Sequence, residues 1–557
     1  MAEAKQKLHS VDAGEGVEAK VDRPSEAIAS RKSRELVIAF AGPIGCGINT
    51  AKEHVTDVLK NSGYVVHEIK ISEYLVECLK NKVVASSGEI YTSGFERYIQ
   101  MQDTGNFLRN VQSDILAEYA IKKIAEIRTA DIPGEIDVTE YVPDRVAYLV
   151  DQLKHPDEVA LLRAVYGNLF YLFGVLSVSA RREGRLEAEG IDATRISELV
   201  ERDRKQIEKH GQQLDKALQL ADFFIRNDHA NVEALVKQIR RFVDLIHGAN
   251  GITPSRKEYG MYMAYAAGLR SACLSRQVGA SIMNPQGSII STGRNDVPKA
   301  GGGLYGPEHE TSDARCVKLE HAKCFNDLYK TKLKDEIGLV IKKKLAEHIG
   351  ELKKGAQRDQ IALLDGVSPG DWAADISEAA HHDTRLGGLI EFSRSIHAEM
   401  DAIVSLARLG GGSTEGATLF TYTFPCHNCA RHIVAAGISR VYFLEPYEKS
   451  LASELHSDAI DIDGKGGSLG TGDSTDAPRV QFLHFEGVAP RQYLNMFTPS
   501  GDRKDPKTGK AVSVNVRIAE KKVPEYLDDY REYELKVVEH LSKIISELGD
   551  NGLSAGV

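Results

Sequence analysis

Four residues in the second half of the chain have the types and spacing of a metal site with an open coordination position. His397 and Glu399 stand two residues apart, and Cys426 and Cys429 follow as a Cys-x-x-Cys pair. One imidazole and two thiolates supply three zinc ligands and leave a fourth position for water, as in catalytic zinc sites. Bound zinc lowers the pKa of its water, and a nearby carboxylate such as Glu399 can move the proton. The alternatives are a four-ligand structural zinc or a redox pair of cysteines.

These residues must be positioned by the helices and strands that the sequence predicts around them. The two ligand segments begin predicted helices at 396–409 and 429–438, where unpaired N–H groups and the helix dipole favour thiolate. A further helix is predicted at 260–274. The accompanying strands are predicted at 277–284, 287–295, 417–424, 440–446 and 480–487.

The pattern His-x-Glu…Pro-Cys-x-x-Cys is the signature of zinc nucleobase deaminases. The segments SACLSRQVGASIMNPQGSIISTGRNDVPKAGGG, HAEMDAI, TFPCHNCARHIVAAGI and VYFLEPYEKS are similar to deoxycytidylate deaminases, over residues 259–447 with a long insertion before His397. The resemblance implies a cytidine-deaminase-like α/β/α domain with a five-stranded mixed sheet. It also implies Zn²⁺ as cofactor, with attack at C4 of the base and proton transfer by Glu399.

The same resemblance assigns substrate contacts. It implies that Asn295 binds the sugar, that Arg276 and Gln277 help to hold the phosphate, and that Tyr447 closes over the base. Ala398, which lies between His397 and Glu399, is also predicted to bind the substrate. The alternative for Arg276 is an ordinary surface arginine, and the alternative for Tyr447 is simple packing.

A second group of potential ligands lies in the insertion. Cys316, His321 and Cys324 stand within nine residues of one another, and some deoxycytidylate deaminases carry a second, structural zinc. Free buried cysteines are the alternative.

A glycine-rich loop near the N-terminus follows a predicted strand at 35–42 and opens a predicted helix at 49–63. That context is typical of a phosphate-binding P-loop, whose backbone N–H groups converge on phosphate oxygens. Ile48 stands where the motif requires lysine, which argues against phosphoryl transfer but leaves nucleotide binding open. The predicted nucleotide-binding residues are Gly42, Gly45, Gly47, Asn49 and Thr50.

The rest of this region resembles nucleotide-monophosphate or dephospho-CoA kinases. Asp151 falls at the end of a predicted strand, where such kinases keep an acidic residue. The run SARREGRL, with Arg181, Arg182 and Arg185, resembles a lid of phosphate-binding arginines, and a solvated charged helix is its alternative.

Composition limits the class of protein. The chain has 557 residues with 42% hydrophobic and 27% charged residues, which is ordinary for a globular protein and excludes fibrous or wholly disordered classes. The net charge of −10, one tryptophan and 7% aromatic residues disfavour a polynucleotide substrate. The N-terminal stretch lacks an apolar secretory region, apolar runs are too short to span a membrane, and seven cysteines form no disulfide framework, so we expect a cytoplasmic protein with no membrane partner.

We therefore expect four segments. They are a flexible tail at 1–34, a P-loop kinase-like domain with a parallel sheet at 35–249, a deaminase domain at 250–499 with an insertion at about 300–390, and an extension with an amphipathic helix at 500–557.

The fusion resembles bacterial anti-phage dCTP deaminases, which implies deamination of free deoxycytidine nucleotides (dCTP, and also dCMP) and depletion of dCTP during infection. The resemblance further implies a regulatory nucleotide at the N-terminal domain, a homo-oligomer and room for an inhibitory small RNA. The alternatives are a housekeeping dCMP deaminase for thymidylate synthesis and a polynucleotide cytidine or adenosine deaminase.

Overall fold

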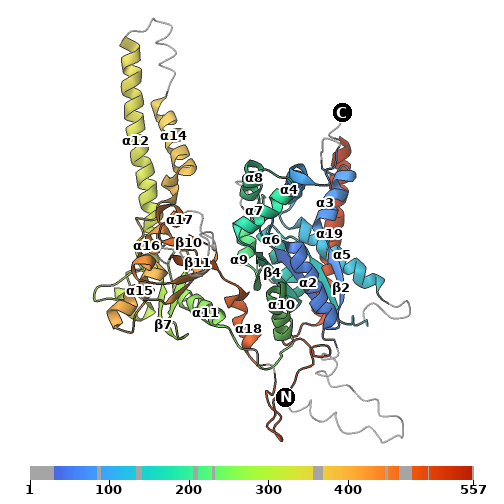
Figure 1. Cartoon of the computed structure of the whole chain (residues 1–557). Helices are drawn as coiled ribbons and strands as arrows, with labels where there is room; N and C mark the ends of the chain where they lie inside the picture. Colours follow the sequence, from blue (N-terminus) through green and yellow to red (C-terminus); the bar gives the residue numbers. More distant parts are fainter. Residues whose placement is uncertain are drawn as a thin grey trace, which may run out of the picture.

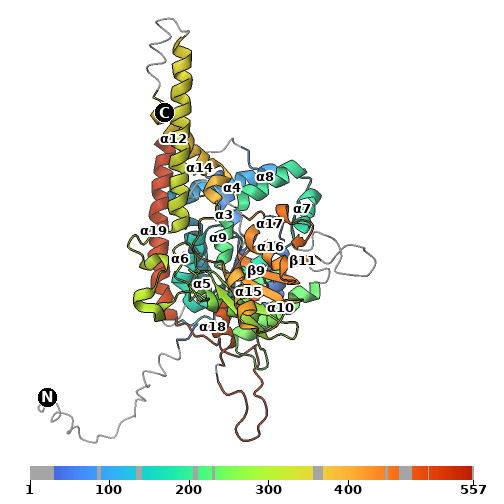
Figure 2. The same cartoon turned by 90° about the vertical axis from the view of Figure 1, so that its left-hand side faces the viewer.

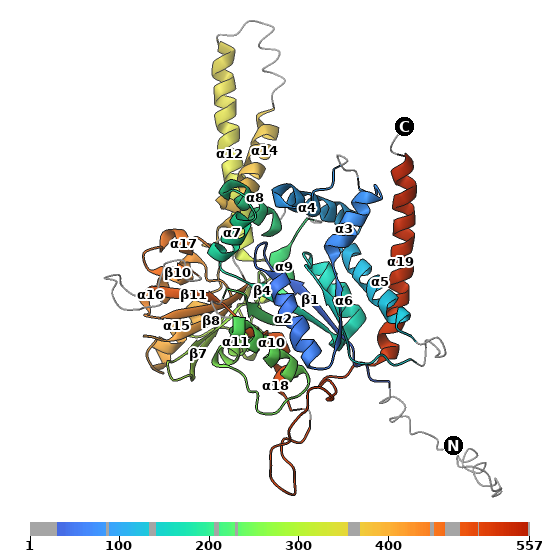
Figure 3. The same ribbon diagram turned by 45° about the vertical axis from the view of Figure 1, so that its right-hand side comes forward.

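A computed structural model of the chain describes residues 31–84, 89–132, 141–204, 211–228, 232–354, 368–445, 450–462, 479–499 and 501–554. Two α/β bodies lie side by side, and a long helical hairpin projects from one of them (Figure 1). The C-terminal helix lies along the outer side of the other body, as the turned view shows (Figure 3).

The first body is built on a six-stranded sheet of order β12-β5-β4-β1-β3-β2. Five strands run parallel, and β12 joins antiparallel to β5. The central strand β1 is buried along its whole length, as expected for a continuous apolar strand covered on both faces. The strands are β1 Leu36–Ala41, β2 Val65–Ile69, β3 Val146–Val150, β4 Phe170–Leu176, β5 Phe223–Arg226 and β12 Gly487–Val488.

Helices cover both faces of this sheet. The apolar side chains of α2 and α10 pack into one core cluster, and those of α3, α5 and α6 pack into the cluster on the opposite face. The helices α7 and α8, here called the lid helices, form a small cluster of their own with Ile44 of the glycine-rich loop. The helices are α2 Ile48–Asn61, α3 Ile71–Lys80, α4 Gly94–Val111, α5 Ile115–Ala130, α6 Pro156–Tyr166, α7 Ser179–Ala188, α8 Ala193–Arg204, α9 Leu214–Gln219 and α10 Val232–Ile246.

The second body contains a mixed sheet of order β10-β11-β9-β8-β6-β7. Its strands are β6 Gly279–Met283, β7 Ile289–Arg294, β8 Thr418–Thr423, β9 Arg440–Glu445, β10 Ile460–Ile462 and β11 Val480–His484. The mixed character agrees with the prediction, but the predicted number of five strands is wrong, because β10 adds a sixth. This strand has three residues and was too short to recognise next to a Gly- and Asp-rich stretch.

The helices of the second body are α11 Arg256–Gly268, α15 Ala398–Leu409, α16 His427–Ala435 and α17 Ala452–Leu455. The insertion adds the hairpin of α12 Phe325–Lys354 and α14 Pro369–Asp383 (Figure 2). Ser368 caps α14 by accepting a hydrogen bond from the Asp371 N–H, and its Ser377 packs beside Gly338 of α12. None of the thirty described residues of α12 is buried, consistent with its projection from the body.

The chain returns to the first body after the second sheet. The strand β12, which the sequence prediction placed within 250–499, extends the first sheet, and α18 Tyr493–Phe497 and α19 Leu527–Ser554 follow. The α19 helix is held by a buried ionic cluster in which Arg128 contacts both Glu35 and Glu534. Tyr148 and Tyr530 hydrogen-bond to the same Glu35 carboxylate. Among the described helices, none combines the length and hydropathy that a membrane crossing requires.

Candidate active site

The three predicted metal ligands meet at the starts of two helices. His397 is the last non-helical residue before α15, and Cys426 is the corresponding residue before α16. Cys426 Sγ accepts a hydrogen bond from the Cys429 N–H at 3.4 Å. The helix α15 packs closely against β7 at Gly293. Glycine is needed there, since a Cβ would lie 2.2 Å from the Ala398 carbonyl oxygen. The first turn of α15 therefore rests directly on the sheet.

The spacing of the donor atoms fits a tetrahedral zinc ion. The Nδ1 atom of His397 lies 3.3 Å from Cys426 Sγ and 3.4 Å from Cys429 Sγ. Zinc bonds of about 2.3 Å to sulfur and 2.1 Å to nitrogen, at a tetrahedral angle, place the two donors about 3.6 Å apart. Among the described residues, these three form the one group of histidine, cysteine and acidic side chains close enough to hold a metal. Three ligands leave a fourth position for water or substrate.

The protein environment prepares one thiol for binding a metal. The pKa of Cys426 is lowered to about 4, because the Cys429 thiol and the His397 ring hydrogen-bond to its sulfur. The pKa of His397 is raised to about 9 by its hydrogen bond to the same sulfur. Thiolate is the form of cysteine that binds zinc, so the lowered pKa favours the binding form of Cys426.

Glu399 lies beside these ligands without joining the group. Its carboxylate is buried, with Oε2 at 3.5 Å from Cys429 Sγ and Oε1 at 3.5 Å from the Thr421 hydroxyl. Burial raises its pKa above that of an ordinary glutamate. A carboxyl group with a raised pKa next to a metal-bound water is suited to take up and return a proton.

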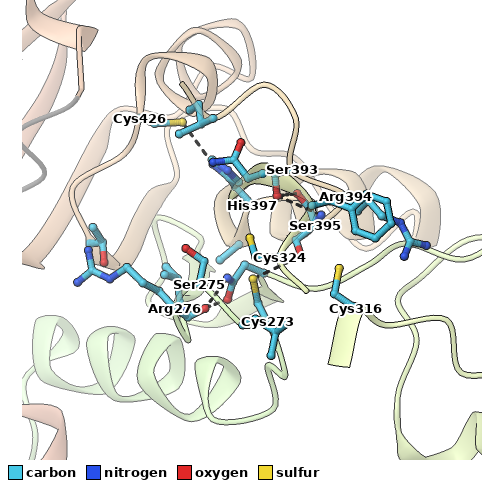
Figure 4. A pocket seen from close by; sticks show the side chains of 18 of the residues that line it. Cys273, Ser275, Arg276, Cys316, Cys324, Ser393, Arg394, Ser395, His397 and Cys426 are labelled. Atoms are coloured by element: carbon cyan, nitrogen blue, oxygen red, sulfur yellow. Dashed lines mark hydrogen bonds between the residues drawn. The ribbon is translucent and has the colours of Figure 1, made fainter. Parts of the chain in front are cut away.

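One pocket opens onto this group (Figure 4). Its floor includes His397, Glu399 and Cys426, and Figure 4 shows that Ser275 and Arg276 lie on a different side from Arg394. Phe325, the first residue of the projecting helix α12, also lines the pocket. The root of the insertion therefore builds part of the wall.

The predicted substrate residues have unequal positions. Asn295 lines the pocket, but its side chain holds the neighbouring loop: its Nδ2 donates to the Arg276 carbonyl and its Oδ1 accepts from the Val278 N–H, each at 2.7 Å. Arg276 lines the pocket while forming an ion pair with Glu445 at the end of β9.

Of the other three predicted substrate residues, only Ala398 lines the pocket in the described part of the chain. Ala398 is buried in the pocket floor. Gln277 donates to the Ser271 carbonyl at 2.8 Å and is not part of the pocket lining. Tyr447 lies outside the described residues.

Several pocket residues were not found from the sequence. Arg394 lies three positions before His397, and its guanidinium stands over the Phe325 ring at 5.1 Å. Its closeness to the His-x-Glu motif was the available signal. Phe325 gave no signal, because it follows more than twenty residues of insertion without strand rhythm.

The three insertion residues considered for a second metal do not assemble. Cys316 and Cys324 line the pocket, where Cys273 is their neighbour, whereas His321 is exposed and outside the lining. Among the residues that the structure describes, they do not form a second group of metal donors.

The glycine-rich loop of the first body is covered by side chains. Lys154 Nζ donates to the Gly42 carbonyl at 2.9 Å, and Asn227 Nδ2 donates to the Gly47 carbonyl at 2.9 Å. Gly45 and Gly47 have positive φ angles of 77° and 79°, which glycine adopts without strain. Asn49 and Thr50 are exposed at the start of α2, whereas Ile48 is buried.

Nearby charged residues are engaged within the protein. Lys52, the lysine closest to the motif position, is buried and pairs with Glu68 at 3.1 Å and Asp151 at 3.6 Å. Arg185 Nη1 donates to the Gly45 carbonyl at 2.8 Å. The other lid arginines differ: Arg182 donates to the Ser179 hydroxyl at 3.3 Å, and Arg181 is exposed.

Comparison with known proteins finds similarities that fall on the second body. Residues 254–445 match the model of the cytidine and deoxycytidylate deaminase zinc-binding region. The deoxycytidylate deaminase of Enterobacteria phage T2 is 28% identical over 190 residues, covering 34% of this chain and 80% of that protein. The enzyme of the same name from Enterobacteria phage T4 is 27% identical over 191 residues, covering 34% and 78%. The apo dCMP deaminase of cyanophage S-TIM5 shares 15% identity, covers 42% of this chain and 99% of that chain, and has a TM-score of 0.20.

The matched zinc-binding region contains the His397, Cys426 and Cys429 group of the structure. Zn²⁺ is therefore the metal of this site.

Proposed function

We propose that this chain, whose residues 254–445 form a hydrolase domain of the cytidine and deoxycytidylate deaminase family, deaminates free deoxycytidine nucleotides, dCMP and dCTP. The observation that carries the proposal is the buried Glu399 carboxylate beside the His397, Cys426 and Cys429 donors at the floor of one pocket. The two phage relatives are deoxycytidylate deaminases by name and are matched over most of their length.

Metal binding and proton transfer are assigned to different residues of the site. His397, Cys426 and Cys429 would hold Zn²⁺, which supplies a water of lowered pKa at its open fourth position. Glu399 takes a proton from the attacking water and delivers it to the ring nitrogen. It then takes the proton of the new C4 hydroxyl and delivers it to the amine, which leaves as ammonia as the C4–N bond breaks. Its raised pKa suits it to hold that proton between the two transfers.

Binding of the nucleotide is proposed to use the neighbouring wall. Asn295, which fixes the 276–278 loop through two hydrogen bonds, positions the sugar side of the pocket. Arg276 faces the phosphate, and a phosphate has to compete for it with Glu445. Gln277 and Tyr447 keep their predicted roles as phosphate and base contacts, with Ala398 in the floor.

A single-stranded polynucleotide is the competing substrate, and the composition argues against it. The chain carries a net charge of −10 and only 7% aromatic residues, whereas such substrates are held by basic grooves and aromatic stacking. The deciding experiment measures ammonia release from dCMP, dCTP, CTP and single-stranded DNA, with Glu399→Ala as the inactive control. Activity confined to the DNA would overturn the proposal.

We further propose that the first body regulates the enzyme by binding a nucleotide at the loop Gly42–Thr50, and that depletion of dCTP serves antiviral defence. The support is the resemblance to anti-phage dCTP deaminases together with the contact between α9 of the first body and β9 of the second. A homo-oligomer and an inhibitory small RNA belong to the same proposal. Phage plating on cells that produce the wild type or Glu399→Ala tests the defence role, which equal plating efficiencies would contradict. Equal plating efficiencies are the result expected of a housekeeping dCMP deaminase.

A further inference from the structure

An acidic side chain of the lid already occupies the glycine-rich loop. Asp203, near the end of α8, accepts a hydrogen bond from the Ile44 N–H through Oδ2 at 2.7 Å. Its other oxygen, Oδ1, lies 2.8 Å from Lys154 Nζ. Asp203 is 3% exposed and Lys154 is 7% exposed, so solvent screens this pair weakly. A backbone N–H and a buried ammonium group are the partners that a phosphate oxygen would take in such a loop.

The lid helices also pack closely against the loop at Gly45. A Cβ built on Gly45 would lie 2.7 Å from the Arg182 carbonyl oxygen of α7, and a phosphate is larger than a methyl group. Arg185 of α7 fastens this arrangement, because it donates to the Gly45 carbonyl at 2.8 Å and to the Asn227 carbonyl at 2.7 Å. Entry of an anion therefore requires the lid helices to move.

We propose that Asp203 is an internal competitor for the phosphate group of a nucleotide at this loop. In the closed state that the structure describes, the Asp203 carboxylate holds the Ile44 N–H and neutralises Lys154. When a phosphate takes both partners, α8 withdraws and Asp203 moves into solvent. The exchange leaves Lys154 paired throughout, so no buried ammonium is stranded in either state. This inference rests on the proposed nucleotide binding at the loop and names the contact that controls it.

Lys154 connects the glycine-rich loop to the second body through α9. The backbone N–H of Gln213, immediately before α9, donates to the Lys154 carbonyl at 2.9 Å. The α9 helix packs against β9, whose last residue Glu445 pairs with Arg276 in the deaminase pocket. Lys154 thus lies between the loop and an element that touches the second sheet.

The first test uses Asp203→Asn, which keeps the shape of the side chain and removes its charge. Binding of inorganic pyrophosphate and of ATP to the full chain is measured by calorimetry. We expect the variant to bind about tenfold to a hundredfold more tightly than the wild type, the worth of one hydrogen bond to a charged group. Glu201→Gln is the matched control, because it removes one exposed negative charge from the same helix and should leave the affinity unchanged. Equal affinities of Asp203→Asn and wild type, or binding by neither, would overturn the inference.

The second test needs no variant and decides the matter if Asp203→Asn fails to fold. Hydrogen exchange of the wild-type chain is followed with and without saturating pyrophosphate. We expect faster exchange in α8 and continued slow exchange at Ile44, because the ligand replaces Asp203 as the acceptor of the Ile44 N–H. Continued protection of α8 while the loop becomes protected would refute competition, and no change in either segment would refute anion binding there. Deamination of dCMP, assayed in the same samples, reports separately on the proposed activity of the second body.

Discussion

Gly293 of β7 is the point at which one added methyl group should disturb catalysis without touching a catalytic side chain. A Cβ at this position would lie 2.2 Å from the Ala398 carbonyl oxygen and 2.3 Å from the Ala402 nitrogen. Both atoms belong to the backbone of α15, so no side chain can rotate away. The distances fall more than 1 Å short of an ordinary contact of about 3.4 Å. In Gly293→Ala the start of α15 must therefore move by about 1 Å from the sheet.

That displacement acts on the catalytic geometry, because His397 precedes α15 and Glu399 lies in its first turn. A misplacement of about 1 Å at a catalytic group costs on the order of a hundredfold in rate. We expect kcat on dCMP to fall by about that factor, with a loss of unfolding free energy of about 1–3 kcal/mol from overpacking.

The assay compares kcat, KM and zinc content of Gly293→Ala, Gly350→Ala and the wild type. Gly350 of α12 is the control, since a Cβ there meets open space. A folded Gly293→Ala protein with kcat within about twofold of the wild type would refute the claim that this contact positions the site.

Three further predictions follow from individual side chains. Glu399→Gln should lower kcat by about a thousandfold while zinc remains bound, because proton transfer is lost and the ligands are intact; loss of the metal, measured by elemental analysis, would contradict this. Lys521 has a pKa of about 7 in the folded protein, lowered by burial, against 10.5 when solvated, so the unfolded chain binds more protons between these values and stability should rise with pH from 7 to 10. Lys521→Met should remove that rise, which amounts to about 4 kcal/mol at most, and an unchanged slope of unfolding free energy against pH would argue against the burial effect. Glu534→Gln should destabilise the chain by about 3 kcal/mol in denaturant titrations, because it breaks the buried pair with Arg128, whereas the exposed control Glu520→Gln should cost almost nothing.

The sequence predicted best what short segments determine. The ligands His397, Cys426 and Cys429 could be chosen because their types and spacing are specific, and the helices that begin beside them follow from local pattern. The continuous apolar run at 35–42 likewise predicted a strand, and the structure shows β1 there, buried in the first sheet. In each case the information lies in short sequence segments.

Features that depend on distant contacts were missed. The helix α14 of the insertion was not predicted, because its small residues, such as Ser377, find their packing partner only in Gly338 of α12. Phe325 enters the pocket wall although nothing near it in sequence indicates a site. The return of β12 to the first sheet joins residues that are more than 250 positions apart.

The contacts of the loop at Gly42–Gly47 also depend on residues that are distant in sequence. Its glycines and context predict a phosphate site, and the structure places Asp203 and Arg185 against the loop. Both belong to the lid helices, more than 130 residues further along the chain. The local motif predicts the backbone conformation of the loop. The side chains that contact the loop come from distant segments and cannot be predicted from the motif.

The central claim is that the second body uses zinc and Glu399 to release ammonia from a free deoxycytidine nucleotide. The most direct measurement follows dCMP and dCTP in the full chain, recording ammonia and the deoxyuridine nucleotide together, before and after removal of zinc by a chelator and its restoration. We predict equal amounts of the two products, loss of activity on chelation, and recovery with Zn²⁺. Full activity of the zinc-depleted chain, or no product from either nucleotide with one zinc bound per chain, would contradict the claim.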